Sequence, residues 1–282
     1  MVNAYLLGRT AKYRATLATL VLCVYALLAL SAQFGTNVAG QGLDPVWAAA
    51  QQRGTLRVAV DFGYAPFTGT RQAVRQGQLR EEPYGYDIEL AQAIGLQLGL
   101  DVEFVPTTLE SAYETLATDQ ADAVISALPY APEQGWRATF SSFYFNAGQV
   151  LVVPERSPIG SVDGLRGQRV GVALGSDADT FLRGLAAKDP GLELHANYDT
   201  AAQAFADLRA GRLEAVVADN AAALAAIHQA PGLRFVPPAL TLEPYAVAVS
   251  NRAYLLRDQI DAALETLRDQ DWFEQAGRRW FK

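Results

Sequence analysis

Residues that commonly build covalent or metal-bound sites are almost absent from this chain. Its 282 residues include one cysteine, Cys23, and two histidines, His195 and His228. One cysteine cannot form a disulfide within the chain, nor can it supply a thiolate metal cluster. Two histidines do not favour a histidine-based metal centre, because such centres draw several ligands into one cluster. We therefore expect neither a metal nor a cofactor.

Basic residues are outnumbered as well. The chain carries 23 lysines and arginines against 30 aspartates and glutamates, a formal net charge of −7. Arg9, Lys12 and Arg14 precede the first acidic residue, Asp44, so the chain after them is more acidic still. An acidic surface repels nucleic acid and anionic lipid. We expect no nucleic-acid partner, and the charge suits a domain outside the cell.

The start of the chain differs from the rest. The three basic residues are followed by an uncharged run over residues 15–43, with its apolar centre at residues 17–30. A basic segment before an apolar one is typical of a signal peptide, and this centre is shorter than the roughly 20 residues that span a bilayer. Residues 1–40 are predicted to be a signal peptide or, alternatively, an N-terminal membrane anchor. Either one places the remainder in the periplasm or on the outer face of the cytoplasmic membrane.

After this leader, apolar runs of strand length alternate with helical patterns. Residues 56–60, 102–105 and 123–126 are predicted strands, and residues 87–98 show one apolar helical face. Such alternation indicates βαβ units and mostly parallel sheets, an α/β fold. Residues 68–83 follow neither period and are predicted to be a surface loop or hairpin.

The second half of the chain repeats this pattern. Residues 113–125 and 205–217 show the same helix, turn and strand, which predicts two similar lobes. The extended stretches 148–153 and 245–250 are expected to cross between the lobes as a two-strand hinge. Lobe 1 is then predicted to comprise residues 45–148 with 245–282, and lobe 2 residues 149–244.

Two helical patterns close the chain. Residues 253–268 and 272–280 are predicted to pack on lobe 1. The first of them carries an apolar stripe for burial, made of Leu256, Ile260, Ala263 and Leu267.

Several short motifs stand in an order and spacing that resemble a known family. They are Gly54-Thr-Leu-Arg-Val-Ala-Val-Asp61, Tyr64-Ala-Pro-Phe67, Gly85-Tyr-Asp87-Ile-Glu-Leu-Ala91, Phe140-Ser141, Leu165-Arg-Gly167-Gln-Arg-Val170-Gly171-Val172, Gly175-Ser176 and Gly211-Arg-Leu-Glu-Ala-Val-Val-Ala-Asp219. Over residues 54–282 the chain resembles family 3 of the bacterial extracellular solute-binding proteins, the polar amino-acid receptors of ABC importers. The resemblance implies the type II periplasmic binding protein fold, a small ligand between two lobes, and an ABC permease in the membrane as partner. It also implies a monomer that binds without bond chemistry.

The resemblance assigns four candidate ligand contacts. The family places the ligand's α-ammonium on an aspartate that corresponds to Asp219, and a contact for the ligand side chain at Asp61. Tyr64 and Phe67 match the family's aromatic wall. Each assignment has a plainer alternative, in which the two rings belong to the core of lobe 1 and the two aspartates are turn residues at strand ends.

One family residue is missing. The arginine that binds the ligand carboxylate falls on Gln134, and the serine-rich approach to it becomes Ser126-Ala127-Leu128-Pro129-Tyr130. An amide brings hydrogen bonds but no charge, so a plain α-amino acid would be held less firmly. Ser126, Tyr130 and Gln134 remain candidate ligand contacts. Arg137 either swings in to replace the arginine or is a solvated surface residue.

On lobe 2 the family receives the carboxylate at a helix start, which here reads Gly175-Ser176-Asp177. Ser176 and Asp177 are candidate contacts, although Asp177 also suits the first turn of a helix. Together with Asp61 and Asp219, Asp177 would line a cleft that lacks its arginine. Carboxylates crowded in this way favour a cation. The predicted ligand is an amine, a polyamine or a cationic amino-acid derivative, or alternatively an amino acid bound through altered contacts.

Two other functions stay open. Periplasmic cyclohexadienyl dehydratases resemble the same family, but they act on dianionic acids and would need basic groups in the cleft. The chain has no Gly-x-Ser-x-Gly or P-loop motif to suggest other enzymatic chemistry. A membrane-tethered ligand sensor is the other alternative, and it would require an uncut leader and a separate signalling partner.

Overall fold

The computed structural model describes residues 44–75, 78–188 and 191–281, and the predicted leader at residues 1–40 lies outside these ranges. The fold is that of Asp44–Lys282, the second of two compact units. Within the described ranges, no helix combines the length and the apolar character that crossing a bilayer requires.

The first of two five-stranded sheets has the strand order β4-β1-β5-β12-β6. Its strands are β1 (Thr55–Val60), β4 (Asp101–Pro106), β5 (Ala123–Val124), β6 (Ala138–Asn146) and β12 (Pro244–Ser250). β1 pairs in parallel with β4 and β5, and β12 pairs antiparallel with β5 and β6. The parallel strands are connected through the helices α4 (Tyr86–Leu98) and α5 (Ala112–Ala117).

The second sheet repeats the design with the order β11-β7-β10-β8-β9. Its strands are β7 (Gln149–Pro154), β8 (Arg169–Ala173), β9 (Glu193–Tyr198), β10 (Ala215–Asp219) and β11 (Leu233–Val236). Its helices are α6 (Asp177–Ala186), α7 (Ala201–Arg209) and α8 (Asn220–Gln229). Here too, three strands are parallel, and β7 joins antiparallel to both β10 and β11. The predicted α/β fold with two similar sheet-and-helix halves is confirmed, and each sheet is mixed rather than mostly parallel.

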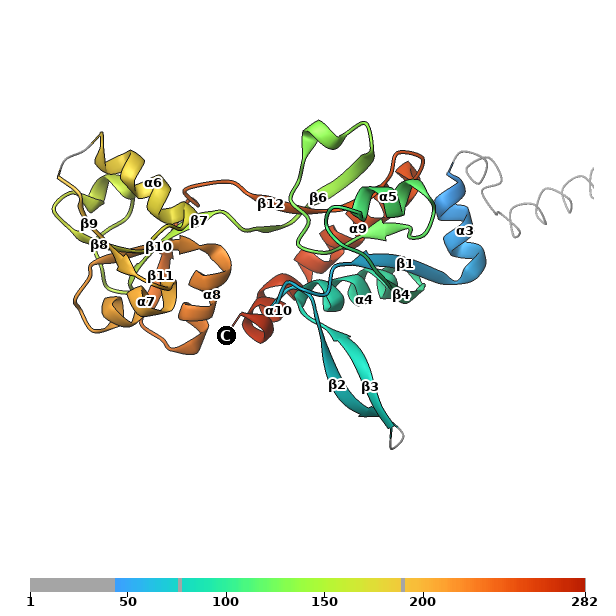
Figure 1. Cartoon of the computed structure of the whole chain (residues 1–282), viewed down its shortest axis with the longest axis horizontal. Helices are drawn as coiled ribbons and strands as arrows, with labels where there is room; N and C mark the ends of the chain where they lie inside the picture. Colours follow the sequence, from blue (N-terminus) through green and yellow to red (C-terminus); the bar gives the residue numbers. More distant parts are fainter. Residues whose placement is uncertain (1–43, 76–77, 189–190, 282) are drawn as a thin grey trace, which may run out of the picture. The chain divides into compact units, whose positions relative to one another are not determined.

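Two short connections link the sheets, after β6 and before β12 (Figure 1). The stretches 148–153 and 245–250, predicted to cross, instead lie mostly within β7 and β12. The side chain of Asn146 ties the two connections together. Its Oδ1 accepts hydrogen bonds from the Gly148 N–H at 3.1 Å and the Glu243 N–H at 2.8 Å, and its Nδ2 donates to the Thr241 carbonyl at 3.3 Å.

The two connections approach each other closely at Gly148, and a substitution there tests this packing. A Cβ at this position would lie 2.3 Å from the Thr241 carbonyl oxygen. We expect Gly148→Ala to lower the free energy of unfolding by about 1–3 kcal/mol, because backbone must shift to admit the methyl group. Gly160→Ala is the matched control, since a Cβ there meets open space. Urea denaturation would contradict this packing if both variants were equally stable.

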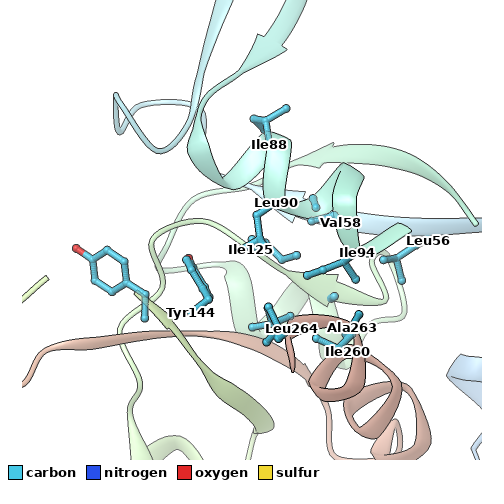
Figure 2. Packing of buried hydrophobic residues seen from close by; sticks show 14 of the residues in the cluster. Leu56, Val58, Ile88, Leu90, Ile94, Ile125, Tyr144, Ile260, Ala263 and Leu264 are labelled. Atoms are coloured by element: carbon cyan, nitrogen blue, oxygen red, sulfur yellow. The ribbon is translucent and has the colours of Figure 1, made fainter. Parts of the chain in front are cut away.

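The core of the first sheet lies around the helices α4 and α9. Ile88, Leu90 and Ile94 of α4 meet Ile260 and Leu264 of α9 (Tyr254–Asp269) around the strands of the sheet (Figure 2). The predicted stripe on α9 is confirmed, because Leu256, Ile260, Ala263 and Leu267 are all buried. The last helix, α10 (Trp272–Trp280), has the predicted bounds. Residues 68–83 hold a hairpin of β2 (Gly69–Arg75) and β3 (Gln78–Tyr84).

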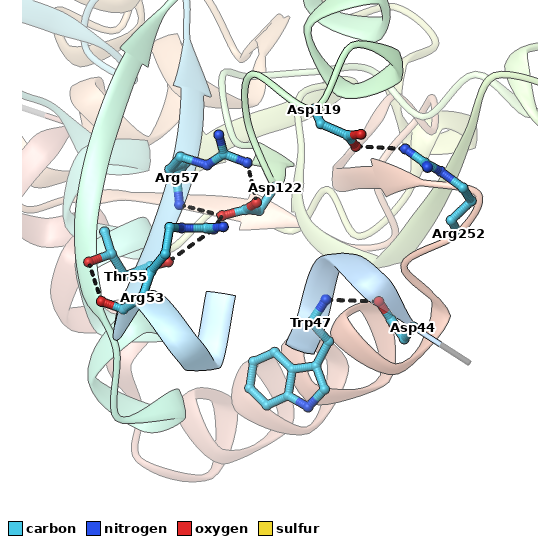
Figure 3. Close-up of polar contacts among 8 residues, drawn as sticks. All are labelled: Asp44, Trp47, Arg53, Thr55, Arg57, Asp119, Asp122 and Arg252. Carbon is cyan, nitrogen blue, oxygen red and sulfur yellow. Dashed lines mark hydrogen bonds and ion pairs between the residues drawn. The ribbon is translucent and has the colours of Figure 1, made fainter. Parts of the chain in front are cut away.

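The start of the described chain is held by two aspartates (Figure 3). Asp44 caps α3 (Pro45–Arg53) by accepting from the Trp47 N–H at 2.8 Å, and its other oxygen accepts from the Leu255 N–H at 2.7 Å. Asp122, at the entrance to β5, pairs with Arg53 and Arg57 at 2.6 and 2.9 Å. These contacts fix α3 against α9 and hold β1 beside β5.

Candidate functional site

A cavity of about 340 Å³ lies at the carboxyl ends of β8 and β10 in the second sheet. Loops at this edge are where open α/β sheets bind ligands. The cavity brings together three of the predicted contacts, Ser176, Asp177 and Asp219. The predicted contacts on the first sheet are not among its lining residues.

Ser176 and Asp177 form the start of α6. The Ser176 hydroxyl donates to the Ala173 carbonyl at 2.7 Å and accepts from the Asp179 N–H at 3.2 Å, which makes it the N-cap of the helix. Its hydrogen bonds are therefore engaged in holding the turn. Asp177, in the first helical turn, is exposed, and its carboxylate has no hydrogen bond in the described part of the chain.

Asp219 ends β10 and caps α8. Its Oδ1 accepts from the Ala222 N–H at 2.9 Å, as an N-cap residue does. Its Oδ2 makes no hydrogen bond within the described residues, and the residue is exposed. Asp219 thus fits both interpretations, since one carboxylate oxygen organises the turn while the other remains free for a ligand.

Gln149 lines the same cavity and was missed by sequence reasoning. It opens β7 directly opposite Asp219 in the antiparallel register, and only 4% of its surface is exposed. Its backbone N–H donates to Thr241 Oγ1 at 2.7 Å, whereas its side-chain amide has no hydrogen bond among the described residues. The available signal was a polar residue at the head of an apolar run. It gains meaning only once β7 is known to pair with β10.

On the first sheet, Asp61 and Ser126 follow the neighbouring strands β1 and β5. Ser126 is 1% exposed, and its hydroxyl accepts from the Asp61 N–H at 2.9 Å. The Asp61 carboxylate accepts from the backbone N–H groups of Gly63 at 3.0 Å and Leu109 at 3.4 Å. The half-buried Asp61 therefore organises its loop, and Ser126 holds the two strand ends together.

The two predicted wall aromatics occupy different environments. Tyr64 is 49% exposed and stacks on Phe67, with ring centroids 5.8 Å apart. Phe67 is 2% exposed and packs among four further rings, those of Tyr86, Phe145, Tyr245 and Phe281. Burial, together with a hydrogen bond to Tyr64, raises the pKa of Tyr245 far above its usual value. Tyr64 is thus the ring that faces solvent, and Phe67 supports it from the core.

Tyr130 and Gln134 follow Ser126 along the chain. Tyr130 is 39% exposed, and its ring packs against Phe140 and Phe143 at centroid distances of 5.2 and 5.0 Å. Gln134 ends a short 3-10 helix, Pro132–Gln134, and is half-buried. Its Oε1 is buried without a hydrogen-bond partner.

Arg137 lies over aromatic rings. Its guanidinium is 5.0 Å from the ring centroid of Tyr113 and 5.4 Å from that of Trp136. Burial raises the pKa of Tyr113, while the positive charge of Arg137 opposes this rise. Cation–π contacts hold this side chain in place. Its service as a replacement for the missing arginine stays a prediction.

The lining of the cavity suits a ligand that carries a positive charge or donates hydrogen bonds. Its lining joins the carboxylates of Asp177 and Asp219 to the free amide of Gln149, and no basic side chain is among the lining residues. Such a set can accept hydrogen bonds from an ammonium or guanidinium group without competition from a built-in cation.

Comparisons with known proteins agree with the fold. A model of the bacterial extracellular solute-binding proteins, family 3, matches residues 56–282. The glutamine-binding protein of an ABC transporter from Bacillus subtilis (strain 168) is 28% identical over 202 residues, which cover 70% of this chain and 72% of that protein.

Two solved structures are also similar. An ancestral cationic amino acid solute-binding protein is 30% identical, with a TM-score of 0.56, and the match covers 83% of this chain and 99% of that one. An ancestral cyclohexadienyl dehydratase is 24% identical, with a TM-score of 0.66, and the match covers 83% and 95% of the two chains. The second likeness is one of fold alone.

Proposed function

Because the chain belongs to family 3 of the bacterial extracellular solute-binding proteins, we propose that it captures an amino acid or organic cation outside the cytoplasmic membrane. It then presents this solute to an ABC permease. The observation that carries the proposal is the cavity at α6 and α8, which is lined by Asp177 and Asp219 and by no basic side chain. The relatives that are named for amino acids support the class of solute.

In this proposal, residues 149–244 form a lobe that receives the cationic group. The free Oδ2 of Asp219 accepts hydrogen bonds from the ligand at the cavity, and the Gln149 amide can accept or donate them. Residues 45–148 with 245–282 form the other lobe, which supplies Asp61 and the exposed ring of Tyr64. The short connections tied by Asn146 act as the hinge on which the lobes close.

A solute screen tests the proposal. Thermal unfolding is followed with L-arginine, L-lysine, putrescine, L-glutamine and L-glutamate. We expect the cationic solutes to raise the unfolding temperature most, because a ligand at about 100 times its dissociation constant adds roughly 2.7 kcal/mol to stability. Stabilisation by L-glutamate alone would contradict a cation-binding cavity. Stabilisation by none of them would contradict the proposed class of solute.

Binding without turnover is part of the proposal. A dehydratase acting on dianionic acids would need basic groups, whereas the lining of the cavity carries two carboxylates. We expect no product when the protein is incubated with prephenate, as followed by ultraviolet absorbance. Product formation would favour the dehydratase alternative.

The proposed location is the periplasm or the outer face of the cytoplasmic membrane. We propose cleavage of the leader and a monomeric mature protein, with anchoring as the alternative. N-terminal sequencing of the exported protein distinguishes the cleaved form from the anchored form.

A further inference from the structure

A buried carboxylate lies behind both candidate segments of the first sheet. Asp87, near the start of α4, has no exposed surface. Its backbone N–H donates to the Phe67 carbonyl at 2.9 Å, at the end of the segment that carries Asp61 and Tyr64. Its Oδ2 accepts from the backbone N–H of Ala127, at the start of the segment that carries Tyr130. One residue thus contacts both segments that are predicted to meet the ligand, the first through its backbone N–H and the second through its carboxylate.

Asp87 is incompletely paired for a charged group in a core. Its Oδ2 also accepts from the Tyr144 hydroxyl at 3.1 Å, but its Oδ1 is buried without any hydrogen-bond partner. Across the residues that the structure describes, no lysine, arginine or histidine forms an ion pair with it. Burial of a carboxylate without a cation is costly, so its presence needs a physical reason.

The backbone of Ala127 offers that reason. Its φ is +46°, a left-handed conformation that is unfavourable for any residue other than glycine. The turn is held on its other side as well by two backbone hydrogen bonds. The Leu128 carbonyl accepts from the Ala246 N–H at 3.1 Å, and the Tyr130 N–H donates to the Pro244 carbonyl at 2.8 Å. The bend directs Ser126 inward toward Asp61 and leaves Tyr130 at the surface.

We propose that Asp87 is a positioning residue for ligand binding. Its carboxylate holds Ala127 in the left-handed conformation and so fixes residues 126–130 in the arrangement that meets the ligand. Asp87 acts through this turn and does not itself touch the ligand. The inference rests on the proposed function for its effect on affinity, but not for its effect on the turn.

The pH dependence of ligand affinity and that of folding stability together distinguish a positioning role for Asp87 from a purely structural one. Burial raises the pKa of Asp87 to about 7, and the hydrogen bonds from Ala127 and Tyr144 oppose this rise. The titratable groups that face it are the phenols of Tyr86, Tyr144 and Tyr245, and burial raises the pKa of each well above its usual value, so they stay neutral. The ionised carboxylate is the stronger acceptor, so the turn is held more firmly above about pH 7 than below it.

Stability moves in the opposite direction. The folded state binds the Asp87 proton more tightly than the unfolded chain does, because its pKa is higher when folded. The free energy of unfolding contributed by this group therefore falls as pH rises from its ordinary pKa toward about 7. Affinity that rises while stability falls is the signature of positioning.

The test uses Asp87→Asn, Ala127→Gly and the double variant. We expect Asp87→Asn to accelerate hydrogen exchange of residues 126–130 in the ligand-free protein and to weaken L-arginine binding about tenfold in calorimetry near pH 8. The double variant should recover most of that affinity, because glycine adopts a positive φ freely. Tyr144→Phe is the comparison. It removes the other hydrogen bond to the same oxygen and so raises the pKa of Asp87 further, and it should therefore move the rise in L-arginine affinity to higher pH.

Three outcomes would overturn the inference: unchanged exchange in Asp87→Asn, unchanged affinity, or a loss that Ala127→Gly does not restore. A wild-type protein that binds none of the screened solutes contradicts the proposed function instead, while hydrogen exchange still reports on the turn.

If Asp87→Asn does not fold, the wild-type protein is tested instead. Its L-arginine affinity should rise several-fold from about pH 6 to about pH 8, and Ala127→Gly should show little of this rise. A wild-type affinity that does not change over this range would overturn the inference.

Discussion

Asp219→Asn is expected to weaken L-arginine binding by about 2 kcal/mol or more, roughly 30-fold in the dissociation constant. The substitution removes the charge at the free Oδ2 but keeps an oxygen that can accept from the Ala222 N–H. Asparagine is as good an N-cap as aspartate, so α8 should keep its start. Affinity is measured by calorimetry, and stability by urea denaturation on the same preparations.

Asp199→Asn is the matched control for this charge change. Asp199 is exposed, precedes α7 and is not among the residues that line the cavity. It should leave L-arginine affinity unchanged within error, while Asp219→Asn loses affinity at nearly constant stability. Equal affinities for the wild type and Asp219→Asn would remove this cavity from the binding site.

Asp122→Ala is expected to have the largest effect on stability, a loss of about 3 kcal/mol in the free energy of unfolding. The Asp122 side chain is 1% exposed, and it accepts from Arg53 Nη2 at 2.6 Å, the Arg57 N–H at 2.8 Å and Arg57 Nη2 at 2.9 Å (Figure 3). Its hydrogen bond raises the pKa of the Arg57 guanidinium. Alanine would leave a backbone N–H and a partly buried guanidinium without their acceptor. We place the loss at the low end for buried pairs because the Arg53 side chain is 34% exposed.

Arg252→Ala supplies the comparison. It breaks the neighbouring ion pair between Arg252 and Asp119, in which the two side chains are 54% and 57% exposed. Exposed pairs contribute about 0–1 kcal/mol, so this variant should be nearly as stable as the wild type in urea. Similar losses for both variants would contradict the special role of the buried Asp122.

Local pattern predicted most of the elements of the fold. The helices α9 and α10 and the strands β1, β4 and β10 follow from the apolar periodicity of their own segments. β6 was not predicted, since Ala138–Asn146 mixes polar and aromatic residues, and its pairing partner β12 lies about a hundred residues further on. The stretch 148–153 was read as a crossing strand because its apolar run cannot show which sheet completes its hydrogen bonds.

The candidate site was partly predictable for the same reason. Ser176, Asp177 and Asp219 share one cavity because parallel strands end at one edge, and that edge follows from the order of elements. The burial of Phe67 depends on rings as distant as Tyr245 and Phe281, which periodicity near Phe67 cannot reveal. The placement of Arg137 over Tyr113 and of Gln149 beside Asp219 likewise depends on tertiary pairing.

A crystal structure with the solute that gives the strongest stabilisation is the most direct test of the binding site. It should show the cationic group of that solute within hydrogen-bond distance of Asp219 Oδ2, with Tyr64 and Asp61 closing over its other side. A solute bound away from Asp219, or one that turns an anionic group toward it, would contradict a cation-binding receptor.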